Sequence, residues 1–247
     1  MTGSQLLVIA LASALGATVK SVTGLGYPLL AVPLISLAVG VEDAVFIVAV
    51  PNLAANLYLC WESRDARGQT RDLGRLIGFG MAGAVVGTLV LVRVAEEWLL
   101  IGLAATIGVF IVQFLRRPEL EMDPLVARRW SPAAGTAAGL MQGAIGVSGP
   151  VVAAWLHGYR LPVRAYIHSV TLIFATTGAV QLVILLAQGQ MSVDRAVGAA
   201  VASVAVAICL PLGVRLRGRL EGPAFNWALL AVLSVSAVSL VFDALSG

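Results

Sequence analysis

Two short, polar, glycine-rich segments interrupt long apolar stretches of this sequence. They read KSVTGLGYPLL at residues 20–30 and QGAIGVSGPVV at residues 142–152, and each contains a proline after its glycines. Glycine allows a turn and a close approach of the backbone to a ligand, and proline suits the first turn of a following helix. A helix that begins there presents free N–H groups and a partial positive charge, which favour an anion. The two segments therefore predict an anion site built from two helix N-termini.

The elements that must position these segments are membrane-spanning helices. Of the 247 residues, 59% are hydrophobic and 12% are charged, and the mean hydropathy is +0.94. Continuous runs rich in Ala, Leu and Val do not show the alternation of a membrane β-barrel. Runs long enough for a spanning helix, about 20 residues, lie at 44–61, 76–94, 98–115, 165–187, 196–214 and 225–245. We predict an all-α polytopic protein, a single membrane domain over residues 1–247, multi-pass in the inner (cytoplasmic) membrane and surrounded by lipid.

An offset of 122 residues aligns the two halves of the sequence and places Gly24 on Gly146 and Pro28 on Pro150. Each interrupted region is too long for one crossing, because residues 4–40 would make ~55 Å of helix and 132–160 ~43 Å, against a bilayer core of ~30 Å. We expect a re-entrant hairpin of two half-helices in each, with the tips meeting near the midplane. The predicted organisation is two inverted repeats, 1–118 and 132–247, joined by a cytoplasmic linker at 116–131. Each repeat is a broken-helix hairpin followed by three transmembrane helices, which gives six full spans and two hairpins.

The arginines test the second hairpin independently, because basic residues collect on the cytoplasmic side. If residues 132–160 cross once, nine arginines lie inside and six outside; if they return to their own side, the division becomes thirteen to two. The second arrangement places both termini outside and residues 62–75, 116–131 and 215–222 inside. The formal charge of +3 then reflects basic cytoplasmic loops, and no nucleic-acid partner is expected.

Lys20 is the only ionisable residue well inside an interrupted region, where a charge costs ~3 kcal/mol or more. The nearest acids, Glu42 and Asp43, lie in a predicted loop, so we expect a bound anion to compensate Lys20. The alternatives are a lysine that snorkels to the surface and Gly, Ser and Thr residues that only allow close helix packing. The predicted substrate-binding residues are Lys20, Ser21, Thr23, Gly24, Gly26, Gln142, Gly146, Ser148 and Gly149.

Three further polar residues are candidates to line the cavity. Asn52 and Asn56 lie four residues apart, on one face of a helix, and would either line the site or bond a neighbouring helix. His168 lies within two turns of Arg164 and would take a proton or substrate role or sit at the interface. Cys60 and Cys209 fit as small buried residues, and neither a metal site nor a cofactor is predicted.

The segments SVTGLGYPLLAVPL (21–34) and GAIGVSGPVVAAWLHGYRLPVRAY (143–166) resemble the paired signatures of the sulfite exporter TauE/SafE family. The resemblance implies a permease for sulfite, sulfonates or other small organosulfur or carboxylate anions that works without ATP hydrolysis. Three positions depart from the family pattern. Lys20 stands where a neutral polar residue is expected, and Tyr27 and Ser148 stand where glycine is more usual. The positions that match the pattern are Ser21, Thr23, Gly24, Gly26, Gly146, Gly149 and Pro150.

These observations predict a secondary transporter that moves a small anion, first a sulfur oxyanion such as sulfite, an organosulfonate or a sulfo-carboxylate, through a site between the two tips. A cation or amino-acid exporter is the alternative, although a cation site favours membrane-embedded carboxylates and only Asp243, near the C-terminal end, is a candidate. An intramembrane enzyme would need a nucleophile–base set or a metal motif, neither of which is seen. A membrane scaffold stays open. Since no P-loop is present, energy would come from a gradient, with H⁺ or Na⁺ as coupling ion, or from a partner subunit.

Overall fold

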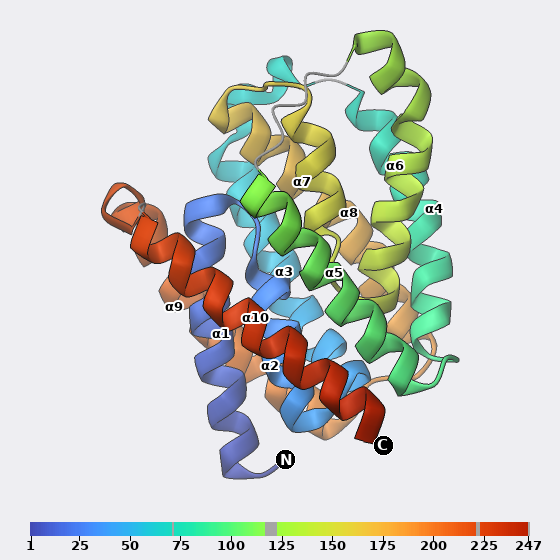
Figure 1. Ribbon diagram of the computed structural model, residues 1–247, viewed down its shortest axis with the longest axis vertical. Helices are drawn as coiled ribbons and strands as arrows, with labels where there is room; N and C mark the ends of the chain where they lie inside the picture. The colour runs from blue at the N-terminus through green and yellow to red at the C-terminus, as the bar shows by residue number, and fades with distance from the viewer. Residues whose placement is uncertain (71, 117–122, 221–222, 247) are drawn as a thin grey trace.

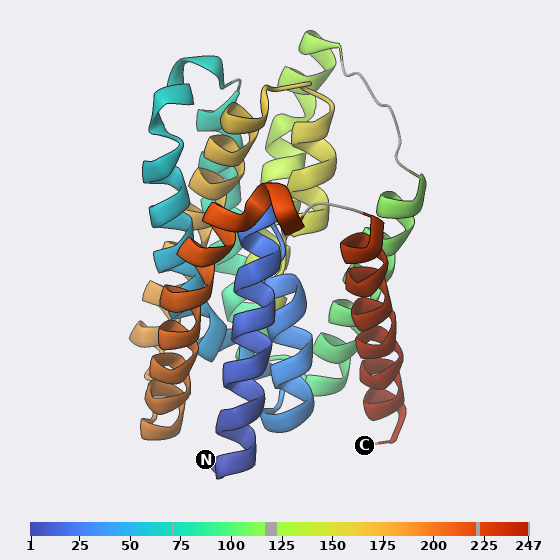
Figure 2. The same cartoon turned by 90° about the vertical axis from the view of Figure 1, so that its left-hand side faces the viewer.

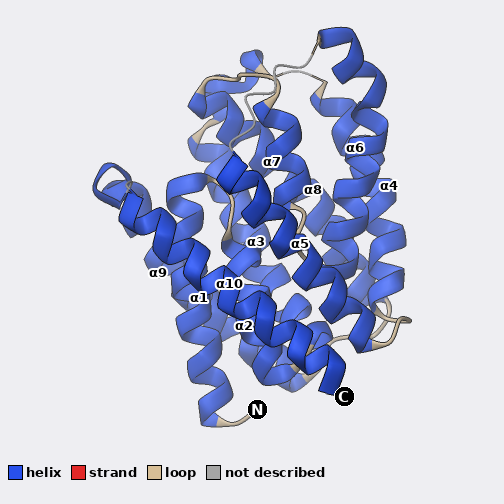
Figure 3. Ribbon diagram, in the orientation of Figure 1, coloured by secondary structure: helices blue, strands red, loops and turns tan. Residues whose placement is uncertain are grey.

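The protein is an all-helical bundle, which confirms the predicted fold class (Figure 3). The computed structural model describes residues 1–70, 72–116, 123–220 and 223–246. In these ranges the helices are α1 (Gly3–Thr23), α2 (Tyr27–Val39), α3 (Val41–Glu62), η1 (Arg64–Gln69), α4 (Leu73–Leu91), α5 (Glu96–Arg116), α6 (Pro124–Ile145), α7 (Gly149–His157), α8 (Val163–Ala187), α9 (Val193–Leu220) and α10 (Pro223–Ser246).

Six helices of the described part are long and apolar enough to cross a membrane: α1, α3, α4, α5, α8 and α9. In α10, the apolar segment Leu229–Leu245 is shorter. Large apolar side chains such as Leu7, Val109 and Val183 point outward and are at least half exposed. An apolar outer surface of this kind suits contact with lipid chains, so the chain is a multi-pass membrane protein.

Two helix hairpins enter the bundle from opposite ends (Figures 1 and 2). In the first, α1 and α2 run antiparallel and both outer ends lie near the N-terminus; in the second, α6 and α7 have their outer ends at the far end of the bundle. The turns need glycine, because Gly24, Gly26 and Gly146 have φ of 72°, 101° and 70°, a region that other residues rarely adopt. The glycine-rich segments therefore form the two hairpin tips.

The two arms of each hairpin differ in length, so the prediction of two half-helices is wrong for the first arms. α1 has 21 residues and α6 has 22, whereas α2 has 13 and α7 has 9. At 1.5 Å per residue the first arms are ~32 Å long, close to the thickness of the bilayer core. The helix α1 continues without a break through Lys20 and Ser21 to Thr23, and α6 continues through Pro132.

Helix packing follows the same pattern in both halves of the chain. α1 packs along α9 and α6 along α4, α3 lies against α9 and α8 against α4, and α2 contacts α10 while α7 contacts α5. All of these contacts run between the two halves, and the α3–α8 and α5–α10 pairs bring together helices that occupy corresponding places in them. Two related halves predict this correspondence, and the division into inverted repeats at 1–118 and 132–247 stays a prediction. Residues 117–122 of the predicted linker lie outside the described residues, as do Arg71 and Arg117 of the charge count.

Glycines bring α4 and α6 into unusually close contact. A Cβ atom at Gly139 would overlap the carbonyl oxygen of Gly80, and one at Gly83 would overlap that of Thr136. Only glycine allows two backbones this close, which is a common way for membrane helices to pack. Because Gly146 directly follows α6, this contact also fixes the position of the second tip.

Ion pairs hold both ends of α3. At one end Arg195 contacts Glu42 at 2.8 Å and Asp43 at 2.7 Å. Both acids lie in the first turn of α3 and not in a loop, because helix α3 begins directly after Gly40 and acidic residues suit a helix N-terminus. They balance the charge of Arg195 and are therefore not available to pair with Lys20.

At the other end of α3, Arg164 contacts Asp65 at 2.7 Å and Glu62 at 3.2 Å. The hydrogen bond from Arg164 holds the pKa of the Asp65 carboxyl below its ordinary value. The guanidinium of Arg75 also donates to the carbonyl of Arg128 at 3.3 Å. We call this the arginine-rich end; its cytoplasmic location stays a prediction.

Candidate functional site

Lys20 is completely buried, three residues before the end of α1. Its Nζ donates to Asn52 Oδ1 at 3.5 Å, a long hydrogen bond, and lies 5.5 Å from the centre of the Phe174 ring. Asn52 comes from α3 and Phe174 from α8. The site around this amine is therefore formed by three helices, and its polar contact is an uncharged amide.

Asn52 and Asn56 form a buried amide pair next to Lys20. Asn52 Oδ1 also accepts from Asn56 Nδ2 at 3.3 Å, and both side chains are at most 3% exposed. Asn56 Oδ1 is buried without a hydrogen-bond donor among the described residues. A buried polar atom without a partner is costly and marks a position where a water or ligand donor would be stabilised. The sequence placed these two residues on one face, and the structure brings that face to Lys20.

The first tip has its own hydrogen bonds. Thr23 Oγ1 accepts from Leu25 N at 3.1 Å and lies 2.7 Å from Leu25 O, which closes the turn. Ser21 donates to Thr18 O at 2.6 Å, and its side chain lies against Gly213 of α9. The structure thus places Thr23 in the tip and Ser21 in a helix contact.

A connected amide network holds the second tip. Ser148 Oγ donates to Gln142 Oε1 at 2.9 Å, and Gln142 Nε2 donates to Gln181 Oε1 at 3.1 Å. Gln181 Nε2 in turn donates to the carbonyls of Gln142 at 2.7 Å and Gly143 at 3.2 Å. Gln142, Ser148 and Gln181 are all at most 3% exposed. In this conformation the predicted donors of the second tip bind one another.

Both tips lie against the α3–α8 pair. A Cβ atom at Gly24 would contact Ile167 of α8 at 3.4 Å, and one at Gly146 would contact Val45 of α3 at 3.5 Å. Val45 and Ile167 are themselves 122 residues apart, the offset that aligns the tips. Each tip therefore packs against the other half of the chain, and α3 and α8 form the wall common to both.

A partly enclosed cavity of about 450 Å³ lies at the first tip. Ligand sites commonly have volumes of ~300–1,000 Å³. The N-cap residue of α2, Gly26, and Leu29 of its first turn are part of the wall, so the free N–H groups expected at a helix start adjoin the cavity. Thr23 also lines it, as does Val19, the neighbour of Lys20.

The rest of the cavity wall is mainly apolar with three polar side chains. It is formed near the ends of α5, α7 and α8 that approach the arginine-rich end, with one residue of α10. These lining residues are Phe110, Gln113, Phe114, Ala153, Ala154, His157, Tyr166 and Leu229, together with Leu25 of the tip. The cavity is thus large enough for an anion with a small organic part.

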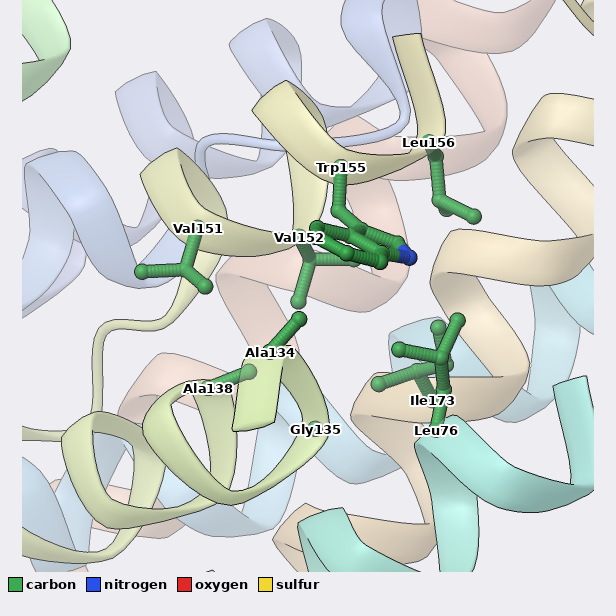
Figure 4. Close-up of a pocket in the computed structure, with 9 residues that line it drawn as sticks. All are labelled: Leu76, Ala134, Gly135, Ala138, Val151, Val152, Trp155, Leu156 and Ile173. Carbon is green, nitrogen blue, oxygen red and sulfur yellow. The ribbon is translucent and has the colours of Figure 1, made fainter. Parts of the chain in front are cut away.

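A second, much smaller gap between α4, α6, α7 and α8 is not a ligand site (Figure 4). Its volume is about 10 Å³, and Trp155, Leu156 and Ile173 are among the side chains that point into it. A space of this size holds at most one water molecule and offers it no polar partner. It is a packing gap.

The structure brings some of the predicted site residues together and separates others. Lys20 joins Asn52 and Asn56, and Thr23 and Gly26 line the cavity, whereas Gly149 has open space at its Cα. His168 is buried, and its Nδ1 lies 3.2 Å from the carbonyl of Cys60. The structure does not place His168 on the cavity wall.

Sequence reasoning missed Gln181, Phe174 and most of the cavity wall. Gln181 is an amide inside an apolar stretch predicted to span the membrane, and that signal alone would have identified it as a candidate. Phe174 and Phe110 carry no such signal, because aromatic residues are ordinary in apolar helices.

The fold and the site define a polytopic helical membrane protein of the permease type, with two broken-helix hairpins and a buried polar site between helices. The chain belongs to the sulfite exporter TauE/SafE family, whose model matches residues 9–240. This is a family of transporters, as the resemblance of the two tip segments predicted. No curated protein and no solved structure matched the chain.

Proposed function

We propose that this protein is a secondary transporter that moves a small anion across the inner membrane, with the arginine-rich end in the cytoplasm. One observation carries the proposal. Lys20 is completely buried at the first tip, its side-chain hydrogen bond goes to an amide, and the tip lines a cavity of about 450 Å³. An anion at the tip would receive the positive charge of Lys20 and the N–H groups at the start of α2.

Sulfur oxyanions, organosulfonates and sulfo-carboxylates fit this arrangement best. Their oxygens accept several N–H donors at once, and charge-assisted hydrogen bonds are stronger than neutral ones. The apolar residues Phe110, Phe114 and Leu29 on the cavity wall favour a substrate with a small organic part. Family membership supports the same class, because the family is named for sulfite export.

The amide network of the second tip supports an alternating role for the two tips. Gln142 and Ser148 bond each other in this conformation, while the first tip adjoins the cavity. We infer that transport exchanges the two arrangements, so that the donors of the second tip become available when the cavity forms on its side. Rocking of two related halves around a central site would produce this exchange.

Flux into proteoliposomes tests the proposal. Purified protein is reconstituted and preloaded with unlabelled sulfite, thiosulfate, ethanesulfonate, lysine or a metal salt, and uptake of the labelled compound is measured. Exchange of at least one sulfur anion, above that in empty liposomes, is expected. Movement of lysine or a metal cation without transport of, or competition by, any sulfur anion or carboxylate would contradict it.

A further inference from the structure

Among the described residues, the amine of Lys20 has no carboxylate partner. The ion pairs there connect Arg164 with Glu62 and Asp65, Arg195 with Glu42 and Asp43, and the N-terminus with Asp194. In an interior of low polarity the charged form of an amine is disfavoured unless an opposite charge is close. The uncharged neighbours of Lys20, Asn52 and Phe174, suit a neutral amine.

Other titratable groups on the helices around Lys20 do not supply a negative charge there. Arg215 of α9 lies two residues beyond Gly213, which contacts Ser21; it is exposed, and its charge has the same sign as an ammonium. The acids of α3 and α9 are in terminal turns and hold the ion pairs named above. Among the residues of these helices whose side chains are described, the remaining titratable ones are Tyr27 of α2, Tyr58 and Cys60 of α3, Tyr166 and His168 of α8 and Cys209 of α9. Arg217 and Arg219 of α9 lie outside that set.

The site contains one further hydrogen-bond acceptor for a charged lysine. A neutral amine has two N–H donors and an ammonium has three. Asn52 Oδ1 accepts one of them, and the adjoining Asn56 Oδ1 is buried without a donor. An anion in the first tip would supply the missing acceptors together with the missing negative charge.

We propose that Lys20 carries the coupling proton of the transport cycle. The inference rests on the proposed function and specifies its energy source. When the anion binds beside Lys20 the neutral amine takes up one proton and becomes an ammonium, and when the anion leaves on the other side the ammonium releases that proton. One proton then crosses with each anion, so that transport of a monovalent anion moves no net charge.

Lys20 lies beside the cavity and not on its wall, because its amine contacts Asn52 of α3 and Phe174 of α8. Val19, its chain neighbour, and Thr23, three residues on, both line the cavity, so the proton would pass between the amine and the cavity along this part of α1. His157 on the facing wall carries an imidazole, a group that can pass a proton to or from water. Sodium is disfavoured as the coupling ion, because a metal cation beside Lys20 would be repelled by the ammonium that the anion requires.

The experiment uses ethanesulfonate, because this anion keeps its charge throughout the neutral pH range and carries no proton of its own. Proteoliposomes with a pH-sensitive dye inside receive an inward gradient of labelled ethanesulfonate, with valinomycin and potassium to hold the membrane potential at zero. Wild-type protein should acidify the interior with about one proton per anion. An acidic exterior should raise the initial uptake rate at least fivefold.

Two substitutions separate charge from proton transfer. Lys20→Arg keeps a permanent cation, so exchange of labelled for unlabelled anion should persist while net proton-coupled uptake falls at least tenfold. Lys20→Met should lose the proton movement as well and exchange the anion more slowly. Arg93→Gln removes one exposed positive charge far from the tip and should behave as the wild type in both assays.

The possible failures are distinguishable. Wild-type exchange of anion with no change of internal pH and no response to a pH gradient would overturn the proton role of Lys20 and leave the proposed function standing. Proton-coupled uptake by Lys20→Arg at the wild-type rate would overturn it too. Absence of anion exchange in the wild type would overturn the proposed function, and this inference with it.

Discussion

Replacement of Lys20 by methionine should weaken anion binding without harming the fold. The amine is completely buried with one hydrogen bond of 3.5 Å, and methionine has a similar length and packs well in apolar surroundings. Asn52 Oδ1 keeps its second donor, Asn56 Nδ2. Since burying a polar amine costs free energy that an apolar side chain does not, the unfolding free energy of the free protein should be unchanged or higher by up to ~2 kcal/mol.

The loss of binding follows from the contact that disappears. A hydrogen bond to a charged group contributes ~1.5–3 kcal/mol, so affinity should fall about 10- to 150-fold. An anion at one hundred times its Kd stabilises the wild type by ~2.7 kcal/mol, whereas a site 30-fold weaker gives ~0.9 kcal/mol at the same concentration.

Thermal unfolding in detergent, followed by tryptophan fluorescence during titration with thiosulfate or ethanesulfonate, measures both quantities. Lys20→Arg should give an intermediate affinity, because its broader planar group fits the same site differently. Arg93→Gln is the control for loss of one charge. A folded Lys20→Met protein that the anion stabilises as much as the wild type would remove Lys20 from the binding site.

Three further predictions concern the frame around the site. Gly83→Ala should destabilise the bundle by ~1–3 kcal/mol, because the added methyl group enters the α4–α6 contact. Gly78 lies in the same helix with open space around it, so Gly78→Ala should stabilise the bundle by up to ~1 kcal/mol. Thermal unfolding measures both changes. Because Arg164 lowers the pKa of Asp65, their contribution to stability is present above the ordinary aspartate pKa of about 3.9 and is lost as pH falls through the lowered pKa. The unfolding temperatures of wild type and Arg164→Gln should therefore differ at neutral pH and approach one another below about pH 4. A cysteine at Gln188 in a cysteine-free background should react with an impermeant reagent only from outside the cell; labelling from the cytoplasm would reject the topology.

The two tips differ in the hydrogen-bond donor that each offers to an anion. The first tip has the amine of Lys20, which α1 carries in every conformation. Gln142 stands at the corresponding position of the second half, 122 residues later, and its amide is engaged with Ser148 and Gln181. Gln142 cannot ionise, so one tip alone supplies an ionisable group to the site.

The amino-acid sequence by itself determined the membrane class and the places where helices break. Apolar runs of spanning length and glycine–proline interruptions are local signals, because burial in lipid and backbone freedom depend on the residue types themselves. Gly24, Gly26 and Gly146 were therefore identified as tip residues from sequence alone. The tip segments also carried the family resemblance that the family model confirms.

Only the tertiary structure decided which polar groups share a site. Lys20 and Asn52 are 32 residues apart and Gln142 and Gln181 are 39 apart, and no periodicity within a helix says which faces of distant helices will meet. The same holds for Glu42 and Asp43, whose partner Arg195 is about 150 residues away, and for Ser21, which packing against Gly213 removes from the cavity. Side-chain contacts between helices depend on how whole helices pack, and close packing between α4 and α6 or between α3 and α8 is a property of the assembled bundle.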